Sequence, residues 1–203
     1  MKFNKIHVTL KSTSPLLMNR FDIEDLKRKP EITERDYDPE KMAEKSAYLA
    51  EIDGKRQLYI PSFAVYHMII ATAKKHPHGK GSLSHVELAK TIRIEPEKIP
   101  LGHCDYEVDV RPIVLRIGEK TYTIRKARAR VPEWMASFNI IYMSEIILDP
   151  YILRGILEDA GCYVGLLDYR PQHMGTYGTF VVKQFYVEGE AGIMEPQSIS
   201  IQG

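Results

Sequence analysis

Hydrophobic residues near the start of the chain recur at about every second position. Ile6, Val8 and Leu10 alternate with polar residues, and Phe3 fits the pattern after one slip, which predicts a strand over 3–11. The same kind of pattern predicts strands at 91–94, 108–117, 120–131, 136–147 and 177–187. Two-residue turns are expected at Asp53-Gly54 and Gly118-Glu119, and the second turn would make 108–131 a long hairpin.

Two longer segments show the three- and four-residue spacing of helices. The first is expected over 62–76, with an apolar stripe formed by Phe63, Tyr66, Ile69, Ile70 and Ala73. The second is expected over 149–160, beginning at Asp149-Pro150 and ending at Gly161 as its C′ glycine. Asp38-Pro39-Glu40 predicts the start of a shorter helix reaching about Leu49, and another is expected over 84–90.

The order of these elements predicts the fold class. It is strand 3–11, helix 62–76, strand 108–117, strand 136–147, helix 149–160 and strand 177–187. This βαββαβ order predicts an α+β, ferredoxin-like (RRM-like) core, with an antiparallel sheet and both helices on one face. We expect one domain over 1–190, insertions at about 19–60 and 78–132, a protruding β-hairpin, and a frayed tail over 191–203.

Composition places the chain among ordinary globular proteins. Hydrophobic residues make up 44% and charged residues 27% of 203 residues, and the net charge is +1. The two cysteines, Cys104 and Cys162, form no CxxC pair, which is typical of a reducing compartment. Without a signal-like N-terminus or an apolar run near the roughly 20 residues of a membrane helix, we expect a cytoplasmic protein with no membrane contact.

Positive charge is concentrated in the predicted hairpin, where Glu119 is the only acid between 111 and 130. Alternation places Lys126, Arg128 and Arg130 on one face of the strand, with small alanines opposite. Such spacing suits the phosphates of a single strand, and Tyr122 could stack a base. The alternative is a solvated edge strand whose charges prevent aggregation. The candidate contacts are Arg111, Arg125, Lys126, Arg128 and Arg130.

Two further segments are candidates for the same surface. Lys74, Lys75 and Lys80 form a second basic patch, which could equally complement a helix dipole and an ordinary soluble loop. The glycine-rich segment 165–180 would offer close backbone approach and free amides, or simply connect tightly into the last strand. Its candidate contacts are Tyr169, Arg170, His173, Gly175 and Gly178, with Tyr177 as a second stacking ring.

Three features together resemble the RAMP superfamily, the RNA-binding proteins of CRISPR effector complexes. They are the first strand running into Ser14-Pro15-Leu16-Leu17, the ferredoxin-like order, and the ending Gly165…Gly175-Thr176-Tyr177-Gly178-Thr179-Phe180. The chain also resembles small phage-borne proteins with this ending and an acidic helix like 38–49.

The resemblance implies a largely sequence-independent binder of single-stranded nucleic acid, with RNA favoured over DNA. It implies a backbone subunit that stacks head to tail into a homo-oligomer or filament, beside other effector subunits, in a CRISPR-like antiviral ribonucleoprotein. The hairpin arm 120–131 or the insertion 19–38 would be the thumb that interrupts the bases.

No residue set indicates catalysis. Some RAMP proteins cut RNA with an acid after the first strand, where this chain has Asp22, and the histidines are scattered without an evident partner. His103 and Cys104 are too few for a zinc site, and we expect no metal or cofactor. Trp134 is expected to anchor the core or a hinge. Three alternatives stay open: a RAMP-type RNA endonuclease, a phage single-stranded-DNA-binding protein, and a structural protein of a phage particle.

Overall fold

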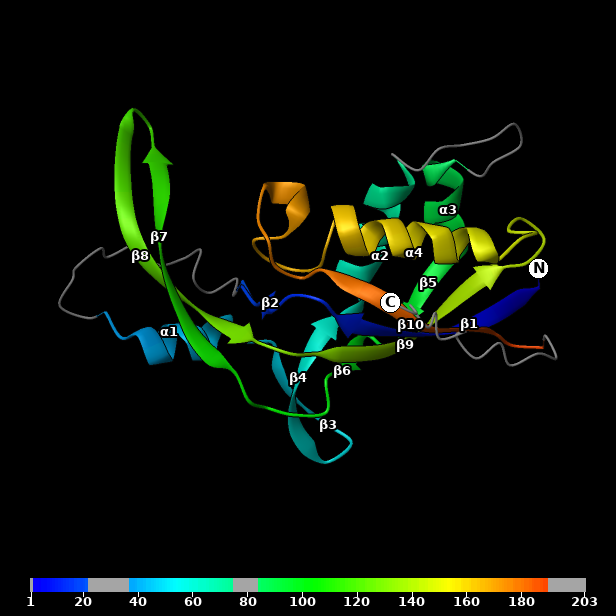
Figure 1. Cartoon of the computed structure of the whole chain (residues 1–203), viewed down its shortest axis with the longest axis horizontal. Coiled ribbons are helices and arrows are strands. Elements are labelled where there is room, and N and C mark those ends of the chain that lie inside the picture. Colours follow the sequence, from blue (N-terminus) through cyan, green and yellow to red (C-terminus); the bar gives the residue numbers. More distant parts are fainter. Residues whose placement is uncertain (1, 22–36, 75–83, 190–203) are drawn as a thin grey trace, which may run out of the picture.

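The computed structural model describes residues 2–21, 37–74 and 84–189, and shows an α+β protein with antiparallel sheets (Figure 1). The strands are β1 (Phe3–Ser12), β2 (Leu16–Leu17), β3 (Leu49–Ile52), β4 (Lys55–Pro61), β5 (Ile92–Glu95), β6 (Lys98–Pro100), β7 (Glu107–Ile117), β8 (Lys120–Val131), β9 (Met135–Met143) and β10 (Phe180–Val187). The helices are α1 (Pro39–Ser46), α2 (Ser62–Ala73), α3 (His85–Thr91), α4 (Tyr151–Tyr163) and the 3-10 turn η3 (Pro171–His173).

The central sheet has the order β10-β1-β9-β5, and every neighbouring pair is antiparallel. The chain enters it as β1, α2, β5, β9, α4 and β10, and the two helices pack against each other on one side of the sheet (Figure 1). This is the βαββαβ arrangement expected of a ferredoxin-like core. The predicted fold class is therefore confirmed.

One strand of the predicted order was wrong. The segment 108–117 is not in the central sheet, because β7 pairs along its whole length with β8 across the turn at Gly118. The short strand β5 takes that position instead, pairing with β9 from Ile92↔Tyr142 to Glu95↔Asn139. The local hairpin satisfies the hydrogen bonds of β7, whereas Ile92 and Ile94 bury apolar side chains under the helices.

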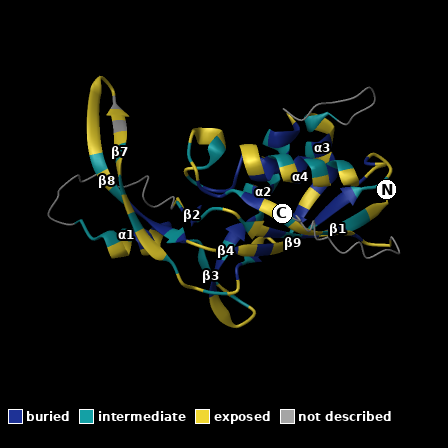
Figure 2. Cartoon of the chain, in the orientation of Figure 1, coloured by how far each residue is buried: buried dark blue, intermediate teal, exposed yellow. Residues whose placement is uncertain are grey.

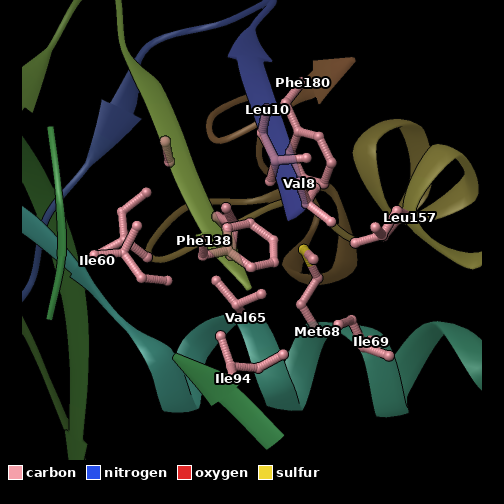
Figure 3. Packing of buried hydrophobic residues seen from close by; sticks show 14 of the residues in the cluster. Val8, Leu10, Ile60, Val65, Met68, Ile69, Ile94, Phe138, Leu157 and Phe180 are labelled. Atoms are coloured by element: carbon pink, nitrogen blue, oxygen red, sulfur yellow. The ribbon is translucent and has the colours of Figure 1, made fainter. Parts of the chain in front are cut away.

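The core lies between the sheet and the two helices. Ile6, Val8 and Leu10 of β1 point into it, and Val65, Met68, Ile69 of α2 and Leu157 of α4 pack against them (Figure 3). The buried face of α2 therefore differs from the predicted stripe, and Phe63 is 57% exposed. Because α2 packs against α4 and α3 as well as the sheet, apolar residues surround most of it and periodicity alone did not orient it.

The predicted end of α4 also needs correction. The helix continues past Gly161 to Tyr163, and Gly165, with φ of 72°, follows its cap. Gly161 has a packing role instead: a Cβ there would lie 2.2 Å from the carbonyl oxygen of Phe180. The glycine lets β10 approach the helix closely.

Several local predictions are confirmed. The Asp38 side chain caps α1, accepting hydrogen bonds from the amides of Glu40 and Lys41. Asp53 and Gly54, both with positive φ, form the two-residue turn of the β3–β4 hairpin. Trp134 is buried, and its Nε1 donates a hydrogen bond to the carbonyl of Ser14 at 3.1 Å.

Two smaller three-stranded sheets adjoin the core: β3-β4-β6 and β2-β8-β7. The inner half of β8 packs against α1, where Ala127 and Ala129 are buried and the amide of Ala129 donates to the Ser46 hydroxyl at 2.8 Å. The outer half of the β7–β8 hairpin, which we call the arm, projects from the molecule and is largely exposed (Figures 1 and 2). No helix in the described ranges combines the length and apolar character needed to cross a membrane.

Candidate nucleic-acid interface

The hairpin register gathers charge on one face at the base of the arm. Residues directly opposite in an antiparallel pair share a face, and the pairs here are Glu107↔Arg130, Asp109↔Arg128 and Arg111↔Lys126. We call these six residues the arm-base face. Arg125 pairs with Pro112 on the other face, with Ala127 and Ala129, and its guanidinium lies 5.7 Å from the ring centre of Tyr37.

The glycine-rich loop between α4 and β10 lies beside this face. β2 joins the two regions, because Leu17 pairs with Arg130 on one side and bridges Asp168 on the other. The amide of Asp168 donates to the carbonyl of Leu17 at 3.1 Å. The predicted neighbourhood of the basic strand and the glycine-rich loop is therefore present.

Arg111 lies within cation–π distance of two tyrosine rings from the loop. Its guanidinium carbon is 5.2 Å from the ring centre of Tyr169 and 4.9 Å from that of Tyr177. Its Nε and Nη2 donate to the two carboxylate oxygens of Asp109 at 2.7 and 3.1 Å, and Nη2 also donates to the Tyr177 hydroxyl. The Asp109 carboxylate is the main reason that the pKa of Arg111 is raised.

Arg128 is the deepest cation of the face, and its side chain is 7% exposed. Its Nε lies 3.3 Å from Oδ2 of Asp168 in the glycine-rich loop, without the alignment of a directed hydrogen bond. The other oxygen of Asp168 accepts from the amide of Tyr169 at 3.0 Å. This ion pair connects the inner half of the hairpin to the loop, with the arginine buried and the carboxylate partly exposed.

Arg130 and Lys126 differ in their surroundings. Arg130 donates to Glu107, and although burial alone would lower its pKa, hydrogen bonds with Tyr177 and Glu107 raise it. Burial lowers the pKa of Lys126, and the neighbouring Arg128 lowers it further. Within the described part of the chain, the ammonium group of Lys126 has no ion-pair partner.

The arm-base face is therefore less positive than the concentration of basic residues in the sequence indicates. Arg111, Arg128 and Arg130 each face a carboxylate. The positions of two of the three acids on this face follow from the sequence. A two-residue turn at 118–119 fixes the register of the hairpin and places Asp109 opposite Arg128 and Glu107 opposite Arg130. Asp168 lies 40 residues beyond Arg128 in the sequence, and no local pattern indicates their pairing.

The glycine-rich loop is held by its own contacts. The amide of Gly175 donates to Arg170 and that of Gly178 to Pro15, so the expectation of free amides is wrong. A Cβ at Gly175 would lie 1.8 Å from the Tyr169 carbonyl oxygen, and one at Gly178 would lie 2.0 Å from that of Leu166. These glycines therefore allow the loop to fold tightly upon itself.

The remaining candidates divide between the loop and more distant places. Arg170 donates to the Leu167 carbonyl at 2.6 Å and to Gln172, and burial lowers its pKa. His173 is exposed in η3. Lys74 lies at the C-terminal end of α2, across the molecule from the arm (Figure 1), so it does not extend the arm-base face. Lys75, Lys80 and Asp22 lie outside the described residues.

A hollow of about 530 Å³ adjoins the loop on the side of α2. Its apolar wall includes Phe63 and Met68, and its polar wall includes Asn19, Asp168 and Arg170. The sequence pattern did not indicate this pocket, because helical periodicity predicted that Phe63 lies in the core. Among residues 2–21, 37–74 and 84–189, no cluster of three His, Cys, Asp or Glu side chains could hold a metal ion.

Comparisons with known proteins concern the fold. No family model matches the chain, and no curated protein sequence matches it. Among solved structures, the chain is similar to one from a CRISPR RNA-guided surveillance complex, with a TM-score of 0.44 and 10% identity over 92% of this chain and 68% of that chain. It is also similar to a chain from a CRISPR RNA-guided surveillance complex, pre-nicking, with a TM-score of 0.42 and 10% identity over 92% of this chain and 75% of that chain.

Proposed function

We propose that this protein binds single-stranded nucleic acid, RNA in preference to DNA, at the arm-base face and along the arm. The observation that carries the proposal is the convergence of Arg111, Lys126 and Arg130 with the rings of Tyr169 and Tyr177 at the root of a projecting hairpin. Guanidinium groups bind phosphates, and the exposed ring of Tyr169 can stack a base without reading sequence, whereas Tyr177 is buried and contacts Arg111.

The carboxylates of the arm-base face determine how readily each cation can pair with a phosphate. Glu107 is more than half exposed, and ion pairs in contact with solvent contribute only about 0–1 kcal/mol. A phosphate can therefore replace Glu107 beside Arg130 at little cost. Lys126 gains more, because it has no direct ion-pair partner in the described structure, and the Asp168 carboxylate raises its pKa less than burial and Arg128 lower it. The arm would then lie along the strand as a thumb.

We infer the assembly of the protein from the resemblance of its sequence to the RAMP superfamily. On that basis the protein is a backbone subunit of a CRISPR-like ribonucleoprotein, and its copies stack head to tail on the bound strand. Non-closing contacts of this kind produce filaments. The absorbance ratio at 260 and 280 nm of the purified protein is the first measurement, because a filament on RNA would carry its RNA through purification.

The test of the site uses the double variant Lys126→Ala/Arg130→Ala. Fluorescence anisotropy with a labelled, unstructured RNA should show affinity reduced about tenfold or more. The slope of log K against log salt should fall by about 1.4, since each phosphate contact on a single strand contributes about 0.7. Arg128 is left intact because its burial would confound binding with folding.

Two further variants test the site: a matched control that should leave binding unchanged, and a variant that should strengthen it. Lys90→Ala/Arg154→Ala removes the same charge from exposed positions on α3 and α4 and should bind as the wild type does. Asp109→Asn frees Arg111 from its carboxylate and should tighten binding. Equal losses in the two double variants would show general charge attraction and overturn the site.

A further inference from the structure

The central sheet has a second face that the helices leave open. On β1, Ile6, Val8 and Leu10 are buried under α2 and α4, so Lys5, His7, Thr9 and Lys11 alternate onto the opposite side. Their partners on β9 and β10 include Ser137, Asn139, Gln184 and Tyr186. His7, Lys11, Ser137, Gln184 and Tyr186 are all exposed. We call this the open sheet face.

Two aromatic rings lie together at the centre of that face. His7 and Tyr186 are directly opposite on β1 and β10, with ring centres 5.9 Å apart and planes at 21°. The Nδ1 atom of His7 is hydrogen-bonded to Oδ1 of Asn139 at 2.7 Å, which fixes the orientation of its ring. Tyr186 is 44% exposed, so a large part of this aromatic residue is accessible to solvent.

The polar side chains around the rings satisfy one another. The hydroxyl of Thr9 is bonded to Ser137 at 3.0 Å and donates to Gln184 at 3.1 Å, which completes a row across β9, β1 and β10. These hydrogen bonds order the side chains beside the two rings. Ordered rings lose little entropy when a planar group stacks on them.

Cations surround the rings. Lys5 and Lys11 come from β1, Arg93 from β5, and Lys183 reaches from β10 to within 3.8 Å of the Met135 sulfur on β9. Among the described residues on this side, the carboxylates are Glu95, which pairs with Arg93, and Glu188 just beyond β10. A third aromatic ring, that of Phe3, lies beneath Arg93, with the guanidinium 5.7 Å from its centre. Phe3 is about 13 Å from His7 along the strand.

We propose that the open sheet face is a second binding surface for single-stranded nucleic acid, distinct from the arm-base face. One base stacks on His7 and Tyr186, and the excess of cations at Lys5, Lys11 and Lys183 holds the flanking phosphates. Rings and lysines on one face of a sheet suit a strand with unpaired bases better than a duplex, whose bases are already stacked.

The test compares Tyr186→Ala with Tyr186→Trp. Anisotropy with a labelled 20-nucleotide oligouridine should show about tenfold weaker binding for Tyr186→Ala, while Tyr186→Trp keeps wild-type affinity because it keeps a stacking ring. Tyr163→Ala removes an exposed tyrosine from α4 and should change nothing. Photocrosslinking with 5-iodouridine in the oligonucleotide should label peptides that contain His7 or Tyr186.

The outcomes separate this proposal from the function proposed above. Loss of binding in Lys126→Ala/Arg130→Ala with none in Tyr186→Ala would overturn the open face alone. The reverse result would support the open face and overturn the arm-base face. A change of oligomeric state in Tyr186→Ala without oligonucleotide, measured by sedimentation, would show that the face binds a second copy of the chain and would also overturn the proposal.

Discussion

The ion pair between Arg128 and Asp168 joins the inner half of the β7–β8 hairpin to the glycine-rich loop. The arginine is almost fully buried, whereas the carboxylate is 32% exposed, so the two partners are not equivalent. Removal of the carboxylate alone leaves the arginine cation in an interior that cannot solvate it. Removal of both side-chain charges leaves no unpaired charge behind. The pair therefore matters more for the position of the loop than for net stability.

This asymmetry gives a prediction about Asp168. The variant Asp168→Ala should lower the free energy of unfolding by about 3 kcal/mol, the lower end of the range for a broken buried pair, because the carboxylate is partly exposed. Urea denaturation followed by circular dichroism measures it.

The double variant Arg128→Met/Asp168→Leu should recover most of that loss, because it leaves no charge unpaired. Glu158→Ala, which removes an exposed carboxylate from α4, should stay within about 0.5 kcal/mol of the wild type. Similar losses in the single and double variants would contradict the asymmetry.

At the scale of elements, the contact between α4 and β10 positions the glycine-rich loop, which connects them. Gly161 lets the backbone of Phe180 approach the helix, and Gly165 turns the chain out of it. Phe180 is buried beneath, where its ring meets Trp134 edge-on at 6.1 Å. The loop therefore starts and ends at fixed points, and Tyr169 and Tyr177 reach Arg111 for that reason.

The variant Gly161→Ala tests this contact. Alanine is favoured over glycine inside a helix by about 1 kcal/mol, so an isolated helix would become more stable. Here the added Cβ would meet the carbonyl oxygen of Phe180 at 2.2 Å, and we expect a net loss of about 1–2 kcal/mol. Thermal unfolding shows whether the variant is less or more stable than the wild type. An increase in stability would refute the close approach of Phe180 to Gly161.

At the scale of the whole molecule, a compact core carries a projecting arm. The buried cluster includes residues of all three sheets, among them Ile6, Ile60 and Val131. The arm beyond Ile113 and Ile124 takes little part in it, and Val114 is 64% exposed. Burial of apolar surface stabilises the core, and the outer arm adds little to it.

Shortening the arm should therefore separate stability from binding. Replacement of residues 114–123 by Asn-Gly would join Ile113 to Ile124 through a two-residue turn. The unfolding temperature should change by less than about 3 °C, while affinity for the 20-nucleotide RNA falls several-fold. A large drop in unfolding temperature would show that the outer arm belongs to the core, and unchanged affinity would remove the arm from the proposed site.

Local patterns in the sequence determined much of the fold. The alternation over β1, the cap at Asp38, the turns at Asp53-Gly54 and Gly118-Glu119, and the helix after Pro150 all depend on neighbouring residues, and the structure has each of them. The basic residues of β8 were predicted from the same kind of evidence, and so was the face that Lys126 shares with Arg128 and Arg130.

Tertiary structure alone decided which strand enters the central sheet, which face of α2 is buried, and which charges meet. Strand pairing and side-chain burial are contacts between distant segments, and a short periodic window carries no information about a distant partner. β5 replaced 108–117 because it completes the core, and Asp168 reached Arg128 because β2 holds the glycine-rich loop against the arm. The sequence determined the local elements and the positions of positive charge, and folding determined how much of that charge is neutralised.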